Sequence, residues 1–464
     1  MPKLRELSAW LRTRLPALLA EHRVPGAAVA VYAGGEIVDH AAGVLNTGTG
    51  VEADADSLFQ IGSITKVWTA TLVMQLVDDG VLDLDQPVRK YLPEFVLADE
   101  DAAARITVRQ LLTHTAGFEG DIFTDTGRGA DCVEKYVATL GDVPQLFAPG
   151  EMFSYNNAAF CVLGRLVEVL RDKEYGACLQ DHLFAPLGLT HAAPSPYEAI
   201  RFRAALGHLS PSPDADPEPA GFWALAPSNA PAGSMLAMRA RDLVTFAAMH
   251  LNDGAGSDGT RVLSADSARA MRQRLVELPD LGLFGDAWGL GWSLFDGAGG
   301  AGGTVVGHDG TTIGQSAFLR VAPEHGVAVA LLTNGGDPIA VYAEVVGHLL
   351  RELTGIELAA PPVPDPAAPR VDASRYVGEY SSSVADIVVS QDADGRVWVE
   401  RVPKGIFAEL AEPQKTELVA MNGDTLILAE PMQGMYIPHA FVGDDGTGRA
   451  LYLHTGRADR RVRA

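Results

Sequence analysis

The segment Gln60-Ile61-Gly62-Ser63-Ile64-Thr65-Lys66-Val67-Trp68 decides the fold of this chain. It places a serine and a lysine three residues apart at the start of a helical stretch, so both side chains lie on one face. A serine hydroxyl becomes nucleophilic when a base takes its proton, and a lysine can be that base when burial or positive charge lowers its pKa. By itself, the spacing is also that of a capping serine beside a solvated lysine.

Two further segments favour catalysis: Pro149-Gly150-Glu151-Met152-Phe153-Ser154-Tyr155-Asn156-Asn157 and Gly307-His308-Asp309-Gly310-Thr311-Thr312-Ile313-Gly314. With the first segment they resemble the SxxK, YxN and HxG motifs of the serine β-lactamase and penicillin-binding-protein superfamily. The resemblance is closest to the class C β-lactamase-like branch and covers roughly residues 20 to 355. It is reinforced by the segments Ile106–Gly117, Pro186–Leu189 and Trp288–Trp292.

The resemblance implies a catalytic set of Ser63, Lys66, Tyr155, Asn157 and His308. It places the Tyr155 phenol, expected to be in part phenolate near a cation, where it could relay a proton to the leaving group. Asn157 would bind the substrate's amide. A tyrosine and an asparagine at a helix start also cap and pack well, but the order of the motifs favours function.

The third motif departs from the KTG of many family members, because His308 stands where the lysine is. A fixed lysine cation suits a substrate carboxylate, whereas a histidine is mostly neutral near pH 7 and can donate or accept a hydrogen bond. The change resembles the esterase, D-aminopeptidase and peptide-cyclising branches. The oxyanion donors implied by the fold are the backbone N–H groups of Ser63 and Thr311.

Other residues near these motifs are weaker candidates for the substrate site. Gly233 predicts a tight turn before a helix and can also border the acyl pocket, and Gly310 lies within the third motif. Trp288, like Trp223, is either core or pocket wall. His114 could be read as the partner of Ser63 in a serine–histidine pair. The resemblance places it in a supporting loop instead, and we expect a core histidine.

Length and periodicity predict two domains. A chain of 464 residues exceeds the usual size of one hydrophobic core. A β-hairpin at 27–38, a mostly helical region at 63–251, strands within 305–332 and a helix at 342–354 predict an α+β domain over residues 1–358. The resemblance gives it an antiparallel sheet flanked by helices and an all-helical subdomain. An N-terminal amphipathic helix carries leucines at positions 4, 7, 11, 15 and 18.

The C-terminal part differs in pattern. Residues 359–370 form a proline-rich linker, too rich in proline for helix or sheet interior. Short alternating segments separated by turn signals then predict a small all-β barrel of lipocalin type over 371–464. The expected strands are Ile387–Ser390, Val397–Val402, Glu417–Met421, Thr425–Leu428 and Ala450–His454.

Composition excludes several kinds of partner and site. A formal net charge of −23 argues against nucleic acid and anionic membranes, which both require a basic surface. Three cysteines without metal-ligand spacing imply neither a disulfide scaffold nor a zinc site, and we expect no cofactor or metal. Charges interrupt any apolar leader at the N-terminus, and no apolar run is long enough to span a bilayer. We therefore expect a cytoplasmic protein.

The two-domain plan resembles the penicillin-binding-protein-type thioesterases, which release nonribosomal peptides in trans as macrocycles. The resemblance implies that a carrier protein of a peptide synthetase delivers a peptidyl thioester, that Ser63 takes the peptide, and that a C-terminal D-residue is favoured. The peptide's own amine would then close a head-to-tail macrolactam. Arg457, expected near the end of the last strand, is our candidate in the barrel for binding the attacking segment. A solvated arginine among its neighbours is the alternative.

Three other functions remain open at this stage. A cytosolic carboxylesterase or D-stereospecific peptidase or amidase of the same fold would use the same residues, with water as acceptor. A noncatalytic acyl-binding or sensor protein would keep the fold and fail to turn over. A scaffold would bind a partner through its barrel and carry a vestigial hydrolase domain.

Overall fold

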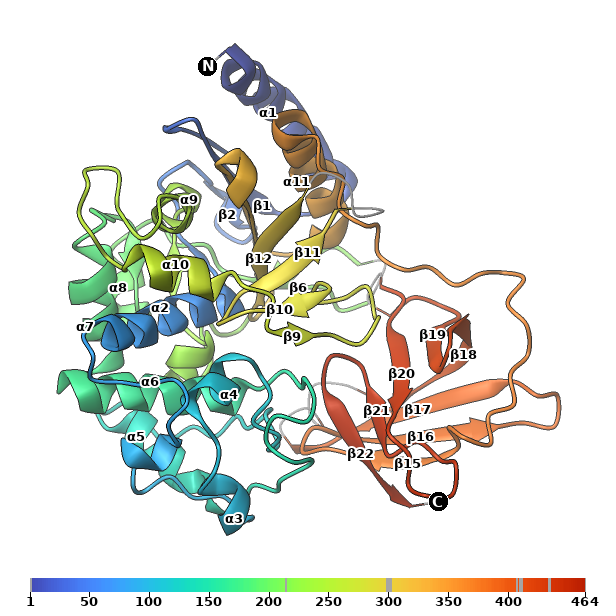
Figure 1. Ribbon diagram of the computed structural model, residues 1–464. Helices are drawn as coiled ribbons and strands as arrows, with labels where there is room; N and C mark the ends of the chain where they lie inside the picture. Colours follow the sequence, from blue (N-terminus) through green and yellow to red (C-terminus); the bar gives the residue numbers. More distant parts are fainter. Residues whose placement is uncertain are drawn as a thin grey trace.

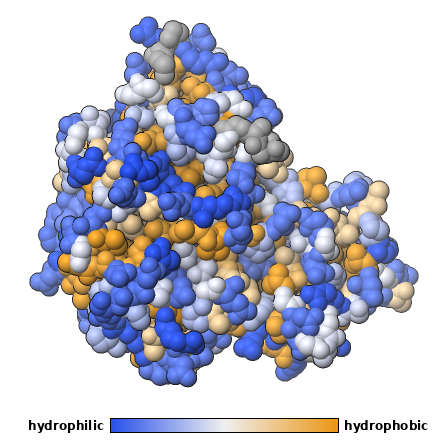
Figure 2. Space-filling model, in the orientation of Figure 1, coloured by the Kyte–Doolittle hydropathy of each residue, from blue (hydrophilic) through white to orange (hydrophobic). Residues whose placement is uncertain are grey.

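The computed structural model describes the chain except for residues 1, 213–214, 298–302, 406–407, 409–411, 433–434 and 464, so the outermost ends of the predicted domain ranges lie outside it. Two bodies lie side by side, joined by an extended segment (Figure 1): a larger one of helices and strands, and a barrel of strands in orange and red. On the same face, hydrophilic residues predominate, and apolar side chains gather along the middle of the larger body (Figure 2).

The larger body is built on a nine-stranded antiparallel sheet in the order β3-β2-β1-β14-β13-β12-β11-β10-β9. The predicted hairpin lies inside this sheet, because its first strand pairs with β14, placing Ala30 opposite Ala330. The strands are β1 Gly26–Ala33, β2 Glu36–Asn46, β3 Val51–Glu52, β9 Val276–Glu277, β10 Ala287–Trp288, β11 Ser293–Asp296, β12 Thr304–Thr311, β13 Ser316–Ala322 and β14 Val327–Thr333.

Helices cover both faces of this sheet, which explains why β1 and β14 are apolar throughout rather than alternating. On one face, α1 (Pro2–Glu21) and α11 (Pro338–Thr354) lie side by side (Figure 1). The leucine stripe of α1 is buried against α11 and the sheet. The amphipathic N-terminal helix expected from the sequence is therefore present.

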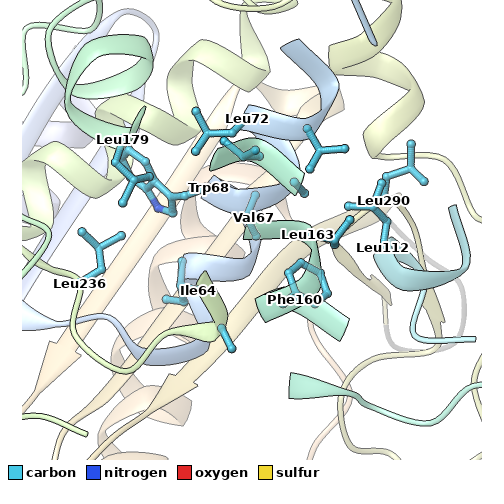
Figure 3. Packing of buried hydrophobic residues seen from close by; sticks show 14 of the residues in the cluster. Ile64, Val67, Trp68, Leu72, Leu112, Phe160, Leu163, Leu179, Leu236 and Leu290 are labelled. Carbon is cyan, nitrogen blue, oxygen red and sulfur yellow. The ribbon is translucent and has the colours of Figure 1, made fainter. Parts of the chain in front are cut away.

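The other face carries the helical part of the body, centred on α2 (Thr65–Asp78), α6 (Asn157–Arg171) and α9 (Ala240–Leu251). Figure 3 shows apolar side chains of α2, α6 and neighbouring segments converging. Trp68 stacks on Phe246 of α9 with ring centroids 3.7 Å apart. Almost every residue of α2 is buried, so the helix is enclosed on all sides and holds the SxxK segment in the core.

Short elements complete this body. The helices are α3 Glu100–Ala103, α4 Val108–Leu112, α5 Cys132–Ala138, α7 Tyr175–Leu179, α8 Pro196–Ala199 and α10 Ala265–Met271. The short 3-10 helices, together with the π-helix η4, are η1 Gly62–Ile64, η2 Val88–Lys90, η3 Thr139–Asp142, η4 Gln180–Phe184, η5 Pro227–Ala232 and η7 Pro323–His325. Strands β4 Phe59–Gln60, β8 Ala237–Met238 and β5 Ala192–Ala193 form one small sheet, and β6 His208–Leu209 and β7 Glu218–Pro219 another.

The C-terminal body is a closed eight-stranded antiparallel barrel in which each strand pairs with the next along the chain. Its strands are β15 Gly378–Ser381, β16 Ala385–Gln391, β17 Val397–Pro403, β18 Gln414–Asn422, β19 Thr425–Leu428, β20 Pro438–Val442, β21 Tyr452–His454 and β22 Ala458–Arg463. The five expected strands are present. Strands β15, β20 and β22 were not among the expected strands. In β22 the run Ala458-Asp459-Arg460-Arg461-Val462-Arg463 carries too many charges to indicate a strand.

The proline-rich segment crosses from one body to the other. Between the end of α11 at Thr354 and the start of β15 at Gly378, residues 359–370 contain no helix or strand. Figure 1 shows this stretch running in the open from α11 to the barrel. The expected fold class is confirmed: an α+β domain with an antiparallel sheet and a helical part, followed by a small all-β barrel.

Candidate active site

The SxxK segment brings a serine and a lysine into hydrogen-bond contact. Ser63 lies in η1, directly before α2, and Lys66 lies in the first turn of that helix. The Lys66 Nζ is 3.0 Å from the Ser63 Oγ and donates to the Ala232 carbonyl at 2.7 Å. Thr65 ties the turn together by donating its hydroxyl to the Gly62 carbonyl. Ser63 is partly exposed, while Lys66 is fully buried, so the pair faces a substrate from one side only.

Burial changes the chemistry of this lysine. It lowers the pKa of Lys66 to about 7, because an ammonium loses its hydration in the core. Cys161 acts against this shift, and the positive charge of Arg457 adds to it. A pKa near neutrality leaves a substantial fraction of Lys66 as the free amine, which can accept the Ser63 proton at neutral pH.

Tyr155 completes the contact group from the segment before α6. The Lys66 Nζ lies 4.8 Å from the centroid of the Tyr155 ring. Burial raises the pKa of Tyr155 above its ordinary value, although a hydrogen bond with Ser63 and the charge of Arg457 act in the opposite direction. The expected partial phenolate is therefore wrong, because desolvation outweighs the nearby cation. Tyr155 is a neutral phenol at neutral pH, a proton donor rather than a base.

The asparagine of the YxN motif is turned toward a carboxylate that the sequence analysis did not single out. Asn157 is buried at the start of α6 and donates its side-chain Nδ2 to the Asp121 Oδ1 at 2.6 Å. The neighbouring Asn156 caps the helix by accepting the Ala159 N–H at 2.7 Å. Asn156 thus serves as the helix cap, whereas the side-chain amide of Asn157 contacts Asp121.

His308 faces the site from β12 as a neutral imidazole. Burial and the charge of Lys66 lower the pKa of His308 to about 3. Its Nδ1 lies 2.6 Å from the Asp309 carbonyl oxygen, which can only accept, so Nδ1 carries the proton. The Nε2 is buried and has no hydrogen-bond partner among the described residues. His308 therefore presents an acceptor, where KTG members of the superfamily carry a lysine cation.

Three glycines allow the backbone to close around Ser63. A Cβ on Gly62 would lie 2.6 Å from the Thr311 N, and a Cβ on Gly310 would lie 3.0 Å from the Ser63 N. The two expected oxyanion donors, Ser63 and Thr311, therefore lie on directly adjacent backbone. Gly233 has φ 118°, and its Cβ would lie 2.9 Å from the Ser63 N. Gly233 is the left-handed C-cap of η5, so the expected tight turn is present, and the short strand β8 lies between this turn and α9.

An aromatic wall backs the catalytic group. Trp288 is buried and meets His308 edge-to-face with centroids 5.4 Å apart, and it packs with Phe153 and Tyr155. Trp223 belongs to a different cluster and donates its Nε1 to the Ala205 carbonyl.

The structure places His114 beneath the YxN segment. Its Nδ1 accepts the Asn156 N–H at 2.9 Å, and its carbonyl accepts the Ser154 N–H at 2.8 Å. These bonds fix the backbone on both sides of Tyr155. The centroid of its ring also lies 4.4 Å from that of the Tyr155 ring, with the two planes tilted by 32°. Its position matches a supporting histidine, with no hydrogen bond to Ser63 among the described contacts.

The barrel reaches the site through the turn between β21 and β22. The Gly456 carbonyl accepts the backbone N–H of Tyr155 at 3.0 Å, and the Ala458 N–H donates to the Ser154 Oγ at 3.1 Å. The His454 Nε2 lies 2.7 Å from the Phe153 carbonyl. The barrel thus holds three consecutive residues of the YxN segment.

Arg457 lies in this turn, close after the end of β21, which was expected to be the last strand, and directly before the further strand β22. Gly456, with φ 98°, turns the chain so that β22 begins one residue after Arg457. The guanidinium carbon lies 4.9 Å from the centroid of the Tyr155 ring, and the Nε lies 2.5 Å from the Asp121 Oδ2. Arg457 is thus a partly buried residue at the site and not a solvated terminal arginine.

Comparisons with known proteins identify the family. The family model named Beta-lactamase matches residues 11–350. Penicillin-binding protein 4 of Amycolatopsis lactamdurans is 46% identical over 369 residues, which cover 79% of this chain and 96% of that protein. The chain belongs to the β-lactamase family. Like other members of this β-lactamase and penicillin-binding-protein superfamily, it is an SxxK serine hydrolase or acyltransferase that works through an acyl-enzyme.

Two further relatives extend the comparison. A crystal structure of SurE superposes with a TM-score of 0.79 at 31% identity, covering 99% of each chain, and SurE has also been solved with D-Leu. The similarity thus includes the barrel. Esterase EstB of Burkholderia gladioli is 33% identical over 232 residues, which cover 46% of this chain and 57% of that enzyme.

The described residues carry few other candidate sites. One group, Glu21, His22 and Glu344, has ligand atoms close enough for a metal ion, but the Arg14 guanidinium pairs with both carboxylates, so we assign no metal there. No helix among the described residues is long and apolar enough to cross a membrane.

Proposed function

We propose that this β-lactamase-family enzyme is a trans-acting thioesterase and peptide cyclase. It takes a nonribosomal peptidyl thioester onto Ser63 and releases the peptide as a head-to-tail macrolactam, favouring a C-terminal D-residue. The observation that carries the proposal is the position of Arg457, a barrel residue whose guanidinium lies over the Tyr155 ring of an SxxK site. An attacking peptide segment, unlike water, offers carbonyls that a guanidinium at this position can bind.

Acylation follows from the contacts of Lys66. The amine of Lys66 takes the proton of Ser63 as the Oγ attacks the thioester carbonyl, and the backbone N–H groups of Ser63 and Thr311 hold the oxyanion. The C–S bond then breaks, and the thiolate takes a proton from Tyr155. Tyr155 is reprotonated by the Lys66 ammonium beside its ring, so the free amine is restored.

Release uses the same groups in reverse. The peptide's terminal amine attacks the Ser63 ester, its surplus proton passes to Lys66, and the Ser63 oxygen leaves after accepting a proton through Tyr155. An amine attacks only as the neutral form, and a base with a pKa of about 7 is matched to that step at neutral pH. The buried aromatic wall around Trp288 and Tyr155 limits access of competing water.

Recognition of the substrate is divided between the domains in this scheme. Asn157 binds an amide of the acyl chain, and the His308 Nε2 accepts a hydrogen bond from it. Arg457 binds the carbonyls of the attacking segment. The substrate preference rests on the similarity to SurE, which has been solved with D-Leu. A carrier protein of a peptide synthetase delivers the thioester, which places the reaction in the cytoplasm.

The test uses peptidyl thioesters that differ only in the configuration of the last residue. Wild-type enzyme and Ser63→Ala are incubated with each, and the products are followed by mass spectrometry. The proposal predicts a cyclic product with the D-ending peptide that requires Ser63. Linear acid from both peptides would refute cyclisation.

A second candidate function is hydrolysis by a carboxylesterase or a D-stereospecific peptidase or amidase. The similarity to esterase EstB and the neutral His308 favour it over β-lactam hydrolysis. It predicts linear acid as the sole product, with the same dependence on Ser63. The same incubation therefore separates the two functions.

A further inference from the structure

A single carboxylate bridges the two domains at the edge of the active site. The Asp121 Oδ1 accepts from the Asn157 Nδ2 at 2.6 Å, and the Asp121 Oδ2 lies 2.5 Å from the Arg457 Nε. The side chain is only 9% exposed. One buried group therefore contacts a residue of the YxN motif on one side and the barrel's arginine on the other.

The backbone around Asp121 is fixed as well. A Cβ on Gly120 would lie 2.6 Å from the Asn156 Cα, and the Gly120 carbonyl accepts the Ala158 N–H at 2.9 Å, so this segment is packed against the start of α6. From the barrel, the Ser383 hydroxyl donates to the Asp121 carbonyl at 3.3 Å. The carboxylate thus has a defined position relative to both domains.

This position determines the orientation of the Asn157 amide. An ionised carboxylate only accepts hydrogen bonds, so the Asn157 NH₂ must face Asp121. The Asn157 Oδ1 is then turned away from Asp121 and is left as an acceptor. A substrate amide N–H is the group that such an acceptor binds. Without Asp121, the amide would be free to flip and present its donors instead.

Arg457 is oriented by the same carboxylate. Its Nε makes a close ion-pair contact with Asp121 without an aligned hydrogen bond, and the two Nη groups are donors for a ligand. The ion pair also offsets the charge of Arg457, which lowers the pKa of Lys66. An incoming amine therefore meets a neutral pair rather than an isolated cation.

We propose that Asp121 is the positioning residue that sets Asn157 for the acyl donor and Arg457 for the acyl acceptor. The inference rests on the proposed function for the acceptor half. Asp121 touches neither Ser63 nor the reacting carbonyl in this scheme. Its effect on the orientation of the two binding groups passes through Asn157 and Arg457, and that property can be measured at a pH where the direct effect of its charge on the pKa of Lys66 no longer changes the rate.

The experiment is a mutant cycle in the full chain with a D-ending peptidyl thioester. Asp121→Ala is made in wild type and in the Asn157→Ala/Arg457→Ala double variant. In wild type we expect a tenfold or greater loss of kcat/KM and a fall in the ratio of cyclic to linear product. In the double variant, at pH 9, where Lys66 is already the free amine, the added substitution changes each quantity less than twofold, since both partners are already absent.

Two further variants separate positioning from a structural role. Asp121→Asn has only one acceptor oxygen, so it can orient one partner and should lie between wild type and Asp121→Ala. Asn422→Ala removes a different interdomain hydrogen bond, the one to Asp280 at 2.8 Å, and should leave the product ratio unchanged. Thermal unfolding of each variant reports whether it is folded.

Three results would overturn the inference. The first is that Asp121→Ala has the same kcat/KM and product ratio as wild type. The second is that Asp121→Ala lowers kcat/KM as much in the double variant as in wild type, and the third is that Asn422→Ala lowers the product ratio as much as Asp121→Ala does. Failure of the proposed function looks different, because wild type would then give linear acid alone. The mutant cycle between Asp121 and Asn157 is still read from kcat/KM of that hydrolysis.

Discussion

The two halves of the active site are held in different ways. Ser63 lies in the turn η1 that runs into α2, and Lys66 lies in the first turn of α2, a helix enclosed by the core of their own domain; the hydrogen bonds of Lys66 are made within that domain. Tyr155 and Asn157 lie on a segment whose backbone is bonded to the barrel and whose side chains meet Arg457 and Asp121. The nucleophile half is thus complete within the larger domain, whereas the half that we propose moves protons and binds substrate is completed by the barrel.

Loss of the nucleophile should have the largest effect and should not depend on the barrel. We expect Ser63→Ala to lower thioester turnover by at least about 10⁴-fold, because residual catalysis then comes only from binding and the oxyanion donors. No acyl adduct should form on the intact protein, as measured by mass spectrometry. An adduct on another residue in this variant would assign the nucleophile elsewhere.

The pH dependence of kcat/KM should report the protonation of Lys66, the lysine of the nucleophile half. Because the pKa of Lys66 is lowered to about 7, kcat/KM should rise as the pH rises through about 7 and then level off. Lys66→Arg keeps the charge at all pH values and should lose about 10²- to 10⁴-fold, as expected for removal of a general base. Measuring kcat/KM from pH 5 to 9 checks both statements. A wild-type profile that is flat across pH 7 would contradict them.

The half of the site that the barrel completes should be sensitive to the addition of one methyl group at Gly456. Gly456 touches the site segment, and a Cβ there would lie 2.3 Å from the Phe284 ring, which packs on Tyr155. We expect Gly456→Ala to lower kcat by about 10- to 100-fold through displacement of Tyr155. Gly446→Ala is the matched control, because Gly446 has a similar φ of 86° and its Cβ would meet nothing within 4 Å. Equal losses of kcat in both variants would show that backbone strain, and not displacement of Tyr155, causes the loss.

The smallest expected effect concerns stability near this interface. Burial raises the pKa of Asp459, next to the Arg457 turn, to about 7. A raised acid pKa stabilises the folded state at low pH, and this contribution is lost as the pH rises through about 7. Asp459→Asn should therefore unfold at a higher temperature than wild type at pH 8 and at a similar temperature near pH 4. Thermal melts at both pH values measure the difference, which is absent if Asp459 ionises normally.

The sequence predicted the nucleophile half better than the other. Ser63 and Lys66 are three residues apart on one helix, so their contact follows from helix geometry alone. The Asp121–Arg457 pair joins residues 336 positions apart, and no local pattern near Asp121 indicates it. The protonation of Tyr155 was wrongly predicted because burial, which decides it, depends on the packing of distant segments. The fold class was predictable from periodicity and motif order, whereas three barrel strands and the sheet strands β3, β9, β10 and β11 were not predicted.

The most direct test of the account compares Arg457→Ala with Arg460→Ala, a surface arginine on the neighbouring strand β22. Each variant and wild type receive the same D-ending peptidyl thioester, and the rate of Ser63 acylation and the ratio of cyclic to linear product are measured together. We expect Arg457→Ala to lower the ratio at least tenfold with acylation nearly intact, and Arg460→Ala to change neither. An unchanged ratio in Arg457→Ala would contradict the claim that the barrel completes the acceptor side of this site.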